Sequence, residues 1–328
     1  MVSPVFPQPV VLCPRFRNYR TSEESDRSLE NKTFVIPRNT ELVFAEPRGF
    51  CFGVRRAIST LEEALAKFGR VYALGSPIHN SREIERLRSM GLEIVEDPSE
   101  IPQGGVVFIR AHGVSDRVVE HLTQKEANII DGTCPFVRKA QERATFLAEE
   151  GYHVIILGDK EHPEVRAIRE FARGPVTVVD PFDILPAGNT GASRIGIVSQ
   201  TTQRRESLSS LVSFVCARTP EVRVFNTICG ATASRQDAVA TLADKVDGII
   251  VTGGKNSANT AKLVEICENA GTPVLWIEDE GEMESGWFRD KRTIGIAAGA
   301  STPDWLIHRL ETKLASAKSA REDEWEDD

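Results

Sequence analysis

Three segments of the chain repeat one pattern, in which a short apolar run leads into a turn, a cysteine and then a helical stretch. The segments are ELVFAEPRGFCFGV, ANIIDGTCPFV and VRVFNTICGAT, and their cysteines are Cys51, Cys134 and Cys229. Apolar residues after Cys51 and Cys134 recur with the spacing of one helix face, and those after Cys229 do so more weakly. A period of this kind indicates one structural unit that occurs three times.

The similarity continues beyond each cysteine. The predicted helix leads to a second strand (VYAL, VIIL or IIVT) that ends in a polar turn, and third and fourth strands follow. His79 and His162 both lie 28 residues after the cysteine of their unit, and Asn256 lies 27 residues after Cys229. Strands that alternate with helices predict an α/β fold with mainly parallel sheets, here three pseudo-threefold-related units. The units cover residues 41–126, 127–219 and 220–316.

The cysteines and polar loops all lie where a predicted strand ends. In parallel sheets, ligands bind outside the carboxyl ends of the strands. Pseudo-threefold packing would therefore bring three thiols and six polar loops to one central cavity.

The composition restricts the class of protein. The chain of 328 residues has a net charge of −8, which argues against bulk attraction to nucleic acid or to an anionic membrane surface. It has no apolar run near the ~20 residues that span a bilayer, and no secretory signal pattern, so we expect a cytoplasmic protein. Residues 1–40 are expected to form a flexible extension, with an organelle transit peptide as the alternative, and residues 317–328 an acidic tail.

Cysteines of a cytoplasmic protein are rarely paired as disulfides, so metal binding or catalysis is the better expectation for the repeated ones. Each of the three begins a predicted helix, where the helix dipole and free N–H groups favour the thiolate that binds metal. Three thiolates suit either a zinc site or an iron–sulfur cluster. The remaining thiols differ: Cys13 lies in the extension, and Cys216 and Cys267 are expected in apolar cores.

The polar loops supply the second half of the predicted site. His79, His112 and His162 each follow a strand in a loop that contains Gly or Pro, and the loops GGKNSAN and AGASTP precede helices. Helix N-termini with hydroxyl and amide groups bind phosphate, so the ligand expected is an anion such as a diphosphate. Glu164 could donate a proton there or could simply favour the first turn of its helix. Thr201 and Thr202 could be ordinary residues at the end of a strand.

Nine motifs occur in the order that is typical of one family. They are PRGFCFGVRRAI, IHN, AHGVS, DGTCPFV, HPEV, QTT, TICGATASRQ, GGKNSANT and AGASTP. In this order they resemble the signatures of the 4-hydroxy-3-methylbut-2-enyl diphosphate reductase family (LytB/IspH), from about residue 41 to 315. The resemblance implies a three-lobed α/β trefoil around a central iron–sulfur cluster. It also implies a reductase that removes the allylic hydroxyl of its substrate and forms isopentenyl and dimethylallyl diphosphate, the last step of the non-mevalonate (MEP) pathway.

The resemblance also implies roles for individual residues. Cys51, Cys134 and Cys229 would hold one [4Fe-4S] cluster whose fourth iron stays open for the substrate hydroxyl. Glu164 would deliver protons, and Thr201 would place its hydroxyl beside Glu164. The implied diphosphate contacts are His79, His112, His162, Ser257, Asn259 and Ser301. A ferredoxin or flavodoxin would supply electrons, since the sequence has no flavin or nicotinamide fingerprint.

Two positions depart from the commoner family pattern. Ala258 stands where a second serine is frequent, and Arg166 and Ala167 follow HPEV where a glycine is expected. They leave open a paralogue that removes a hydroxyl from another substrate. A non-enzymatic zinc protein or redox sensor with three thiolates is the third possibility. It would not explain Glu164 or the loops whose composition is typical of phosphate binding.

Overall fold

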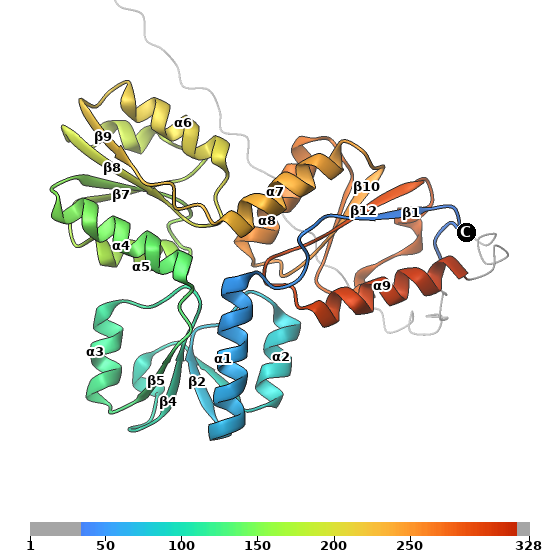
Figure 1. The fold of residues 1–328 in the computed structure, drawn as a ribbon, viewed down its shortest axis with the longest axis horizontal. Helices are drawn as coiled ribbons and strands as arrows, with labels where there is room; N and C mark the ends of the chain where they lie inside the picture. Colours follow the sequence, from blue (N-terminus) through green and yellow to red (C-terminus); the bar gives the residue numbers. More distant parts are fainter. Residues whose placement is uncertain (1–33, 320–328) are drawn as a thin grey trace, which may run out of the picture. The chain divides into compact units, whose positions relative to one another are not determined.

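The computed structural model describes residues 34–319, in which every named strand belongs to one of three four-stranded parallel sheets. Figure 1 shows the three sheets with their helices. The predicted α/β class and the three pseudo-threefold-related units are thereby confirmed.

The first sheet has the strand order β3-β2-β4-β5. Its strands are β2 (Val71–Leu74), β3 (Leu92–Val95), β4 (Val106–Ile109) and β5 (Asn128–Asp131). Its helices are α1 (Phe52–Phe68), α2 (Ser81–Ser89), η1 (Pro98–Glu100) and α3 (Asp116–Gln124). Buried residues of α1 and α2 pack on one face of this sheet, and Leu122 of α3 packs on the other.

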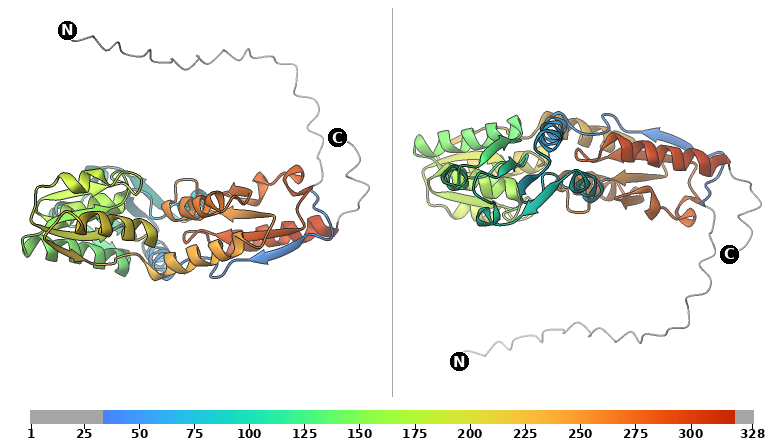
Figure 2. Two further views of the ribbon diagram at one scale, coloured as in Figure 1. Left: turned by 90° about the horizontal axis from the view of Figure 1, so that it is seen from above. Right: turned by 90° about the horizontal axis from the view of Figure 1, so that it is seen from below.

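The second sheet repeats this order as β7-β6-β8-β9. Its strands are β6 (His153–Leu157), β7 (Val176–Val179), β8 (Arg194–Ser199) and β9 (Glu221–Val224). Its helices are α4 (Pro135–Glu149), α5 (Pro163–Ala172), η2 (Leu185–Asn189) and α6 (Arg205–Cys216). Helices α4 and α5 cover one face and α6 the other, and Figure 2 also shows helices on both sides of this sheet.

The third sheet has the order β11-β10-β12-β1. Its strands are β1 (Glu41–Phe44), β10 (Gly248–Thr252), β11 (Val274–Ile277) and β12 (Thr293–Ala298). Its helices are α7 (Gly230–Ala243), α8 (Ala258–Asn269), η3 (Glu280–Glu282), η4 (Ser285–Phe288) and α9 (Asp304–Ser319). Helices α7 and α8 contribute to one core cluster with β10 and β12.

The sheets do not follow the boundaries predicted between the units. The first strand of each repeat pairs with the sheet of another unit. Strand β5 of the second repeat joins the first sheet, and β9 of the third repeat joins the second sheet. Strand β1 of the first repeat pairs with β12 of the third sheet. Each repeated cysteine therefore lies on the segment that leaves one sheet and enters the first helix of the next. By their contacts, the described residues from Val35 onward accordingly form one compact unit.

The predicted extension ends earlier than residue 40. Val35, Ile36 and Thr40 are buried, and the amide of Ile36 donates a hydrogen bond to the carbonyl oxygen of Ala317 at 3.4 Å. Apolar residues of this segment thus complete a core beside α9. The rest of the predicted extension and residues 320–328 of the predicted tail lie outside the described residues.

Two cysteines outside the repeated pattern differ in their exposure. Cys267 is fully buried as expected, but Cys216, the last residue of α6, is exposed, so its assignment to a core was wrong. The side chain of Cys216 points away from the helix face that buries Leu208, Leu211 and Val215.

Among the described residues, no helix is both long and apolar enough to cross a membrane.

Candidate functional site

One cavity at the carboxyl ends of the strands brings together all eleven residues that the sequence analysis selected. They come from all three lobes and are Cys51, His79, His112, Cys134, His162, Glu164, Thr201, Cys229, Ser257, Asn259 and Ser301. Parallel strands and the helices that follow them explain this arrangement, because strand ends and helix N-termini meet at the same edge of a sheet.

The three cysteines occupy the same position in three helices. Cys51, Cys134 and Cys229 are the N-cap residues of α1, α4 and α7, each with extended backbone angles. Burial raises the pKa of Cys51 and of Cys134, whereas the amides at the start of each helix act in the opposite direction. Without a bound metal these two thiols are therefore protonated near neutral pH, and metal binding would release their protons.

The thiols are close to one another. Charges on the cysteines interact in all three pairs, which raises the pKa of Cys51 and Cys134 further. A Cβ atom on Gly53 would lie 2.4 Å from the Sγ of Cys134, so only glycine lets α1 approach α4 this closely. Three thiols in one cavity could hold an iron–sulfur cluster or a zinc ion.

A buried arginine lies beside two of the thiols. Arg235 of α7 is 3% exposed, and its Nη2 donates a hydrogen bond to the carbonyl oxygen of Gly49 at 2.7 Å. Its charge interacts with Cys51 and Cys229, and its Nε has no hydrogen-bond partner among the described residues. Burial of a cation without an ion pair is costly, so the site favours an anionic group next to Arg235.

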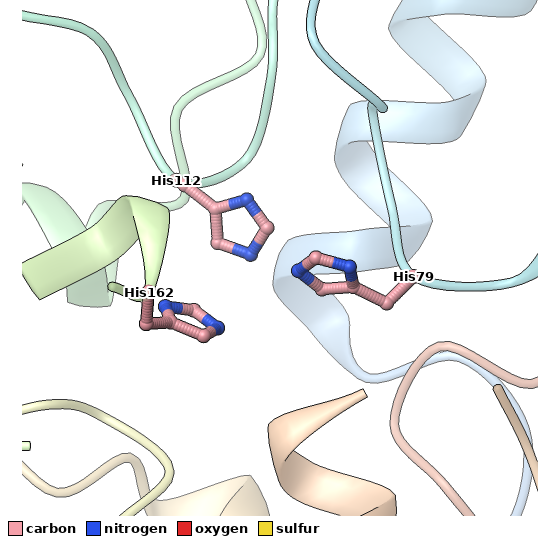
Figure 3. Close-up of side chains that lie close together, drawn as sticks. All are labelled: His79, His112 and His162. Carbon is pink, nitrogen blue, oxygen red and sulfur yellow. The ribbon is translucent and has the colours of Figure 1, made fainter. Parts of the chain in front are cut away.

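The three histidine side chains lie close together on one side of the cavity, as Figure 3 shows. Their ring centroids are 4.9 Å apart for His79 and His112, 5.2 Å for His112 and His162, and 5.6 Å for His79 and His162. Both ring nitrogens of His79 and the Nδ1 of His112 are buried without a hydrogen-bond partner among residues 34–319. Unpartnered polar atoms of this kind indicate a polar ligand in the cavity.

All three imidazoles are neutral at physiological pH. Burial lowers the pKa of His79, lowers that of His162 to about 4 and that of His112 well below its usual value. The Nδ1 of His162 accepts a hydrogen bond from the amide of Glu164 at 3.2 Å, which leaves the proton on Nε2. His162 can therefore donate to an acceptor in the cavity.

A cation stands behind the histidines. The guanidinium of Arg110 lowers the pKa of His79, His112 and His162, and its Nε has no partner within the described part of the chain. Gly75, with φ of +69°, makes room for it, since a Cβ there would lie 2.3 Å from Nη1 of Arg110. Nitrogen atoms of the three imidazoles lie within 4.8 Å of one another and could also hold a metal ion. Arg110 opposes a cation there and favours an anion.

The start of α8 closes another side of the cavity. Ser257 is its N-cap, and the Oγ of Ser257 accepts a hydrogen bond from the amide of Thr260 at 3.3 Å. Asn259 is buried, and neither its Oδ1 nor its Nδ2 has a partner among the described residues. The Oγ of Ser301 donates to the carbonyl oxygen of His79 at 3.1 Å. A helix N-terminus with free amide and hydroxyl groups suits an anion.

Glu164 is the carboxyl group of the cavity. It is 2% exposed, and burial raises its pKa to about 7. Two groups of Thr201 act against this rise: the amide donates to Oε1 at 2.6 Å and the hydroxyl donates to Oε2 at 2.9 Å. A carboxyl group that is half protonated near pH 7 can serve as a general acid.

Sequence reasoning missed three groups near the cavity. Arg110 and Arg235 were not selected, because a buried arginine gives no periodic signal and most arginines are exposed. Thr202 was set aside with no role, although it lines the cavity and its buried Oγ1 has no partner among the residues described. Two positions were noted above as departures from the commoner family pattern. Ala258 lines the cavity, whereas Arg166 is exposed and forms an ion pair with Glu161.

Known proteins resemble this chain over most of its length. A family model described as LytB protein matches residues 42–315. The 4-hydroxy-3-methylbut-2-enyl diphosphate reductase of Geobacter sulfurreducens is 43% identical over 270 residues, which cover 82% of this chain and 95% of the relative. The protein of the same name from Helicobacter pylori is 40% identical over 277 residues, which cover 84% of this chain and 99% of the relative.

Two solved structures agree with these relatives. A structure of (E)-4-hydroxy-3-methyl-but-2-enyl diphosphate reductase, described as the terminal enzyme of the non-mevalonate pathway, matches with a TM-score of 0.64 and 39% identity over 84% of this chain and 99% of its own. The E-1-hydroxy-2-methyl-but-2-enyl-4-diphosphate reductase of Plasmodium falciparum matches with a TM-score of 0.80 and 28% identity over 84% and 87%. The resemblance predicted from nine motifs is thereby confirmed: the chain belongs to the LytB protein family.

Proposed function

We propose that this chain is a reductase of 4-hydroxy-3-methylbut-2-enyl diphosphate that forms isopentenyl and dimethylallyl diphosphate at the end of the non-mevalonate pathway. Relatives that are about 40% identical carry this reductase name. One observation carries the proposal: a single cavity combines three helix-capping thiols, three neutral imidazoles and a buried carboxyl group with a pKa of about 7.

The thiols of Cys51, Cys134 and Cys229 would hold one [4Fe-4S] cluster with one iron left open. The residues present fit such a group, because the three thiols are close together and the Nε of the buried Arg235 has no hydrogen-bond partner among the described residues. When bound, the cluster would supply electrons and a Lewis acid for the leaving oxygen.

The histidine side of the cavity would bind the diphosphate. Neutral His79 and His112 have ring nitrogens without a partner among the described residues, and Arg110 adds a positive charge behind them. Asn259 and the N-terminus of α8 provide further donors. These groups would fix one end of the substrate and turn its hydroxyl toward the thiol side.

Glu164 would give the proton that lets the hydroxyl leave as water. The overall reaction consumes two electrons and two protons, breaks one C–O bond, forms one C–H bond and releases one water molecule. Thr201 would hold Glu164 in place through two hydrogen bonds, so that the acid does not turn away from the cavity. Burial of Glu164 keeps about half of the carboxyl groups protonated near pH 7, and the reaction requires this protonated form.

Electrons would come from a separate protein, for which a ferredoxin or flavodoxin is the expected donor. The substrate and this donor are the only partners that the proposal requires. The cytoplasmic location stays a prediction from the sequence.

Ala258 keeps a second function open. It lines the cavity at the start of α8, where a serine would add a hydroxyl donor. A related enzyme that removes the hydroxyl of another substrate would share every other feature of the site. Arg166 no longer supports this alternative, since its side chain is exposed.

The test combines metal analysis with a substrate assay. Protein reconstituted without oxygen should contain about four irons per chain and should convert the allylic diphosphate when a chemical reductant is present. A full cluster with no conversion of this substrate would contradict the proposed activity. Zinc in place of iron would contradict the cofactor.

A further inference from the structure

Two phenylalanines next to the thiols are unusually exposed. Phe52 is 64% exposed and Phe136 is 42% exposed, although large apolar side chains are normally covered. Phe52 directly follows Cys51, and Phe136 lies two residues after Cys134. Each therefore belongs to the first turn of a helix that begins at a candidate metal ligand.

The two helix starts are in contact and form one surface. A Cβ on Gly53 would lie 2.4 Å from the Sγ of Cys134, and Nη1 of Arg56 donates a hydrogen bond to the carbonyl oxygen of Thr133 at 3.0 Å. Exposed aromatic and basic side chains surround these contacts, with the exposed carboxylates of Asp131 and Asp304 beside them. The aromatic and basic side chains define the Phe52–Phe136 surface and are Phe52, Arg55, Arg56, Phe136, Arg138 and Lys139.

This surface is basic although the chain is acidic. Four cations lie on it, and Asp304 and Asp131 form ion pairs with two of them, Arg55 and Arg138. A net positive charge therefore remains on a surface of a protein whose net charge is −8. Aromatic residues with surrounding arginines are typical of protein interfaces.

We propose that the Phe52–Phe136 surface docks an acidic one-electron carrier protein that reduces the metal group held by Cys51 and Cys134. This inference rests on the proposed function. Each encounter would transfer one electron and leave the carrier oxidised, so two encounters would supply the two electrons of one turnover. Opposite charges would guide the carrier to the surface, and the two aromatic side chains would be buried against it.

Charge decides between this partner and others. Two copies of the chain would bring the same basic surface together, which like charges oppose. Nucleic acid or an anionic membrane would meet a chain with a net charge of −8, whereas a small acidic protein needs to approach only this surface.

The experiment compares two reductants in the reconstituted protein. Phe52→Ala and Lys139→Glu, alone and together, change exposed side chains that do not line the cavity. Phe182→Ala with Lys245→Glu is the matched control, since Phe182 is 81% exposed and Lys245 is an exposed lysine two residues after the end of α7. Turnover is measured with reduced methyl viologen and with an acidic [2Fe–2S] ferredoxin that its reductase keeps reduced, and ferredoxin affinity is measured by calorimetry.

The double variant should lose at least about ten-fold in ferredoxin-supported kcat/KM and in ferredoxin affinity, because aromatic anchors and rim charges dominate such interfaces. Its turnover with methyl viologen should match that of the wild type, and the control should keep both activities. Unchanged ferredoxin affinity and turnover would overturn the docking proposal, and so would an equal loss with both reductants. Absence of any wild-type turnover with methyl viologen would instead contradict the proposed function, while the calorimetry would still decide the docking.

Discussion

Replacement of Glu164 by Gln separates proton transfer from the other tasks of the cavity. Glu164 accepts two hydrogen bonds from Thr201, one from the amide to Oε1 and one from the hydroxyl to Oε2. In Glu164→Gln, the amide oxygen can still accept from the Thr201 amide. The Thr201 hydroxyl can turn and accept from the new NH₂ group, because a hydroxyl both donates and accepts. We therefore expect the variant to keep its fold, its metal group and its ligand affinity.

The expected loss of turnover follows from the role of the proton. A positioned general acid contributes about 10²- to 10⁴-fold, so Glu164→Gln should lower kcat by about that factor while leaving the substrate affinity nearly unchanged. The pKa of about 7 adds a pH signature. Wild-type turnover should fall as the pH rises through about 7, because the protonated form is lost, and the residual turnover of the variant should lack this dependence.

Stability gives a second readout that does not depend on activity. Burial raises the pKa of Glu164 from 4.5 to about 7 in the folded protein, so the folded state binds the proton more tightly than the unfolded state. Stability from this group is therefore complete below about pH 4.5 and is lost as the pH rises to about 7. At 1.36 kcal/mol for each unit of pKa, the loss amounts to about 3 kcal/mol.

Urea unfolding of the metal-free wild type and of metal-free Glu164→Gln, each at pH 5 and pH 8, isolates this loss as the difference between the two proteins, because the buried histidines with lowered pKa contribute equally to both. Methyl viologen as the reductant keeps electron delivery independent of the carrier protein in the turnover assay. Turnover of Glu164→Gln within a few-fold of wild type would refute the reasoning, since the proton would then come from elsewhere.

Three further substitutions test neighbouring parts of the site. Thr201→Val removes the hydroxyl bond to Glu164, so the pKa of Glu164 should rise further and the pH profile of turnover should move to higher pH, with a smaller loss of kcat than in Glu164→Gln. Ala258→Ser places a hydroxyl at the start of α8 and should tighten the binding of inorganic pyrophosphate by about three- to ten-fold, measured by calorimetry. Arg235→Gln removes a buried cation beside the thiols and should lower both the iron content and the reduction potential of the reconstituted protein, measured by redox titration, whereas Arg235→Lys should retain more of both.

Local patterns in the sequence predicted the elements well but not their partners. The apolar runs VYAL and LEIV became β2 and β3 within the same bounds, because alternation and turn residues report where a strand lies. Such a pattern does not report which sheet a strand joins. An apolar strand such as β5 buries its side chains equally well beside β4 of the first sheet or within a sheet of its own unit.

The residues of the site also divide into those that a local sequence pattern predicts and those that it does not. The repeat offsets pointed to His79 and His162, and both line one cavity, since equivalent strand ends meet at equivalent places. Arg110 and Arg235 could not be found in this way, because their burial depends on neighbours from distant segments. Gly49 lies 186 residues from Arg235 in the sequence, and its carbonyl oxygen accepts the hydrogen bond that fixes Arg235.

The exchange of strands explains why the three thiols converge. If each unit formed its own closed sheet, its cysteine would lie at the carboxyl end of a strand inside that unit, and three separate sites could result. Instead β5 completes the first sheet while α4 packs on the second, so Cys134 between them must lie at the junction of two lobes. The same holds for Cys229 between β9 and α7, and for Cys51 between β1 and α1. When each of three lobes receives a strand from another, the three connections meet at one common junction. The N-termini of α1, α4 and α7, which stabilise negative charge, therefore lie in a single cavity.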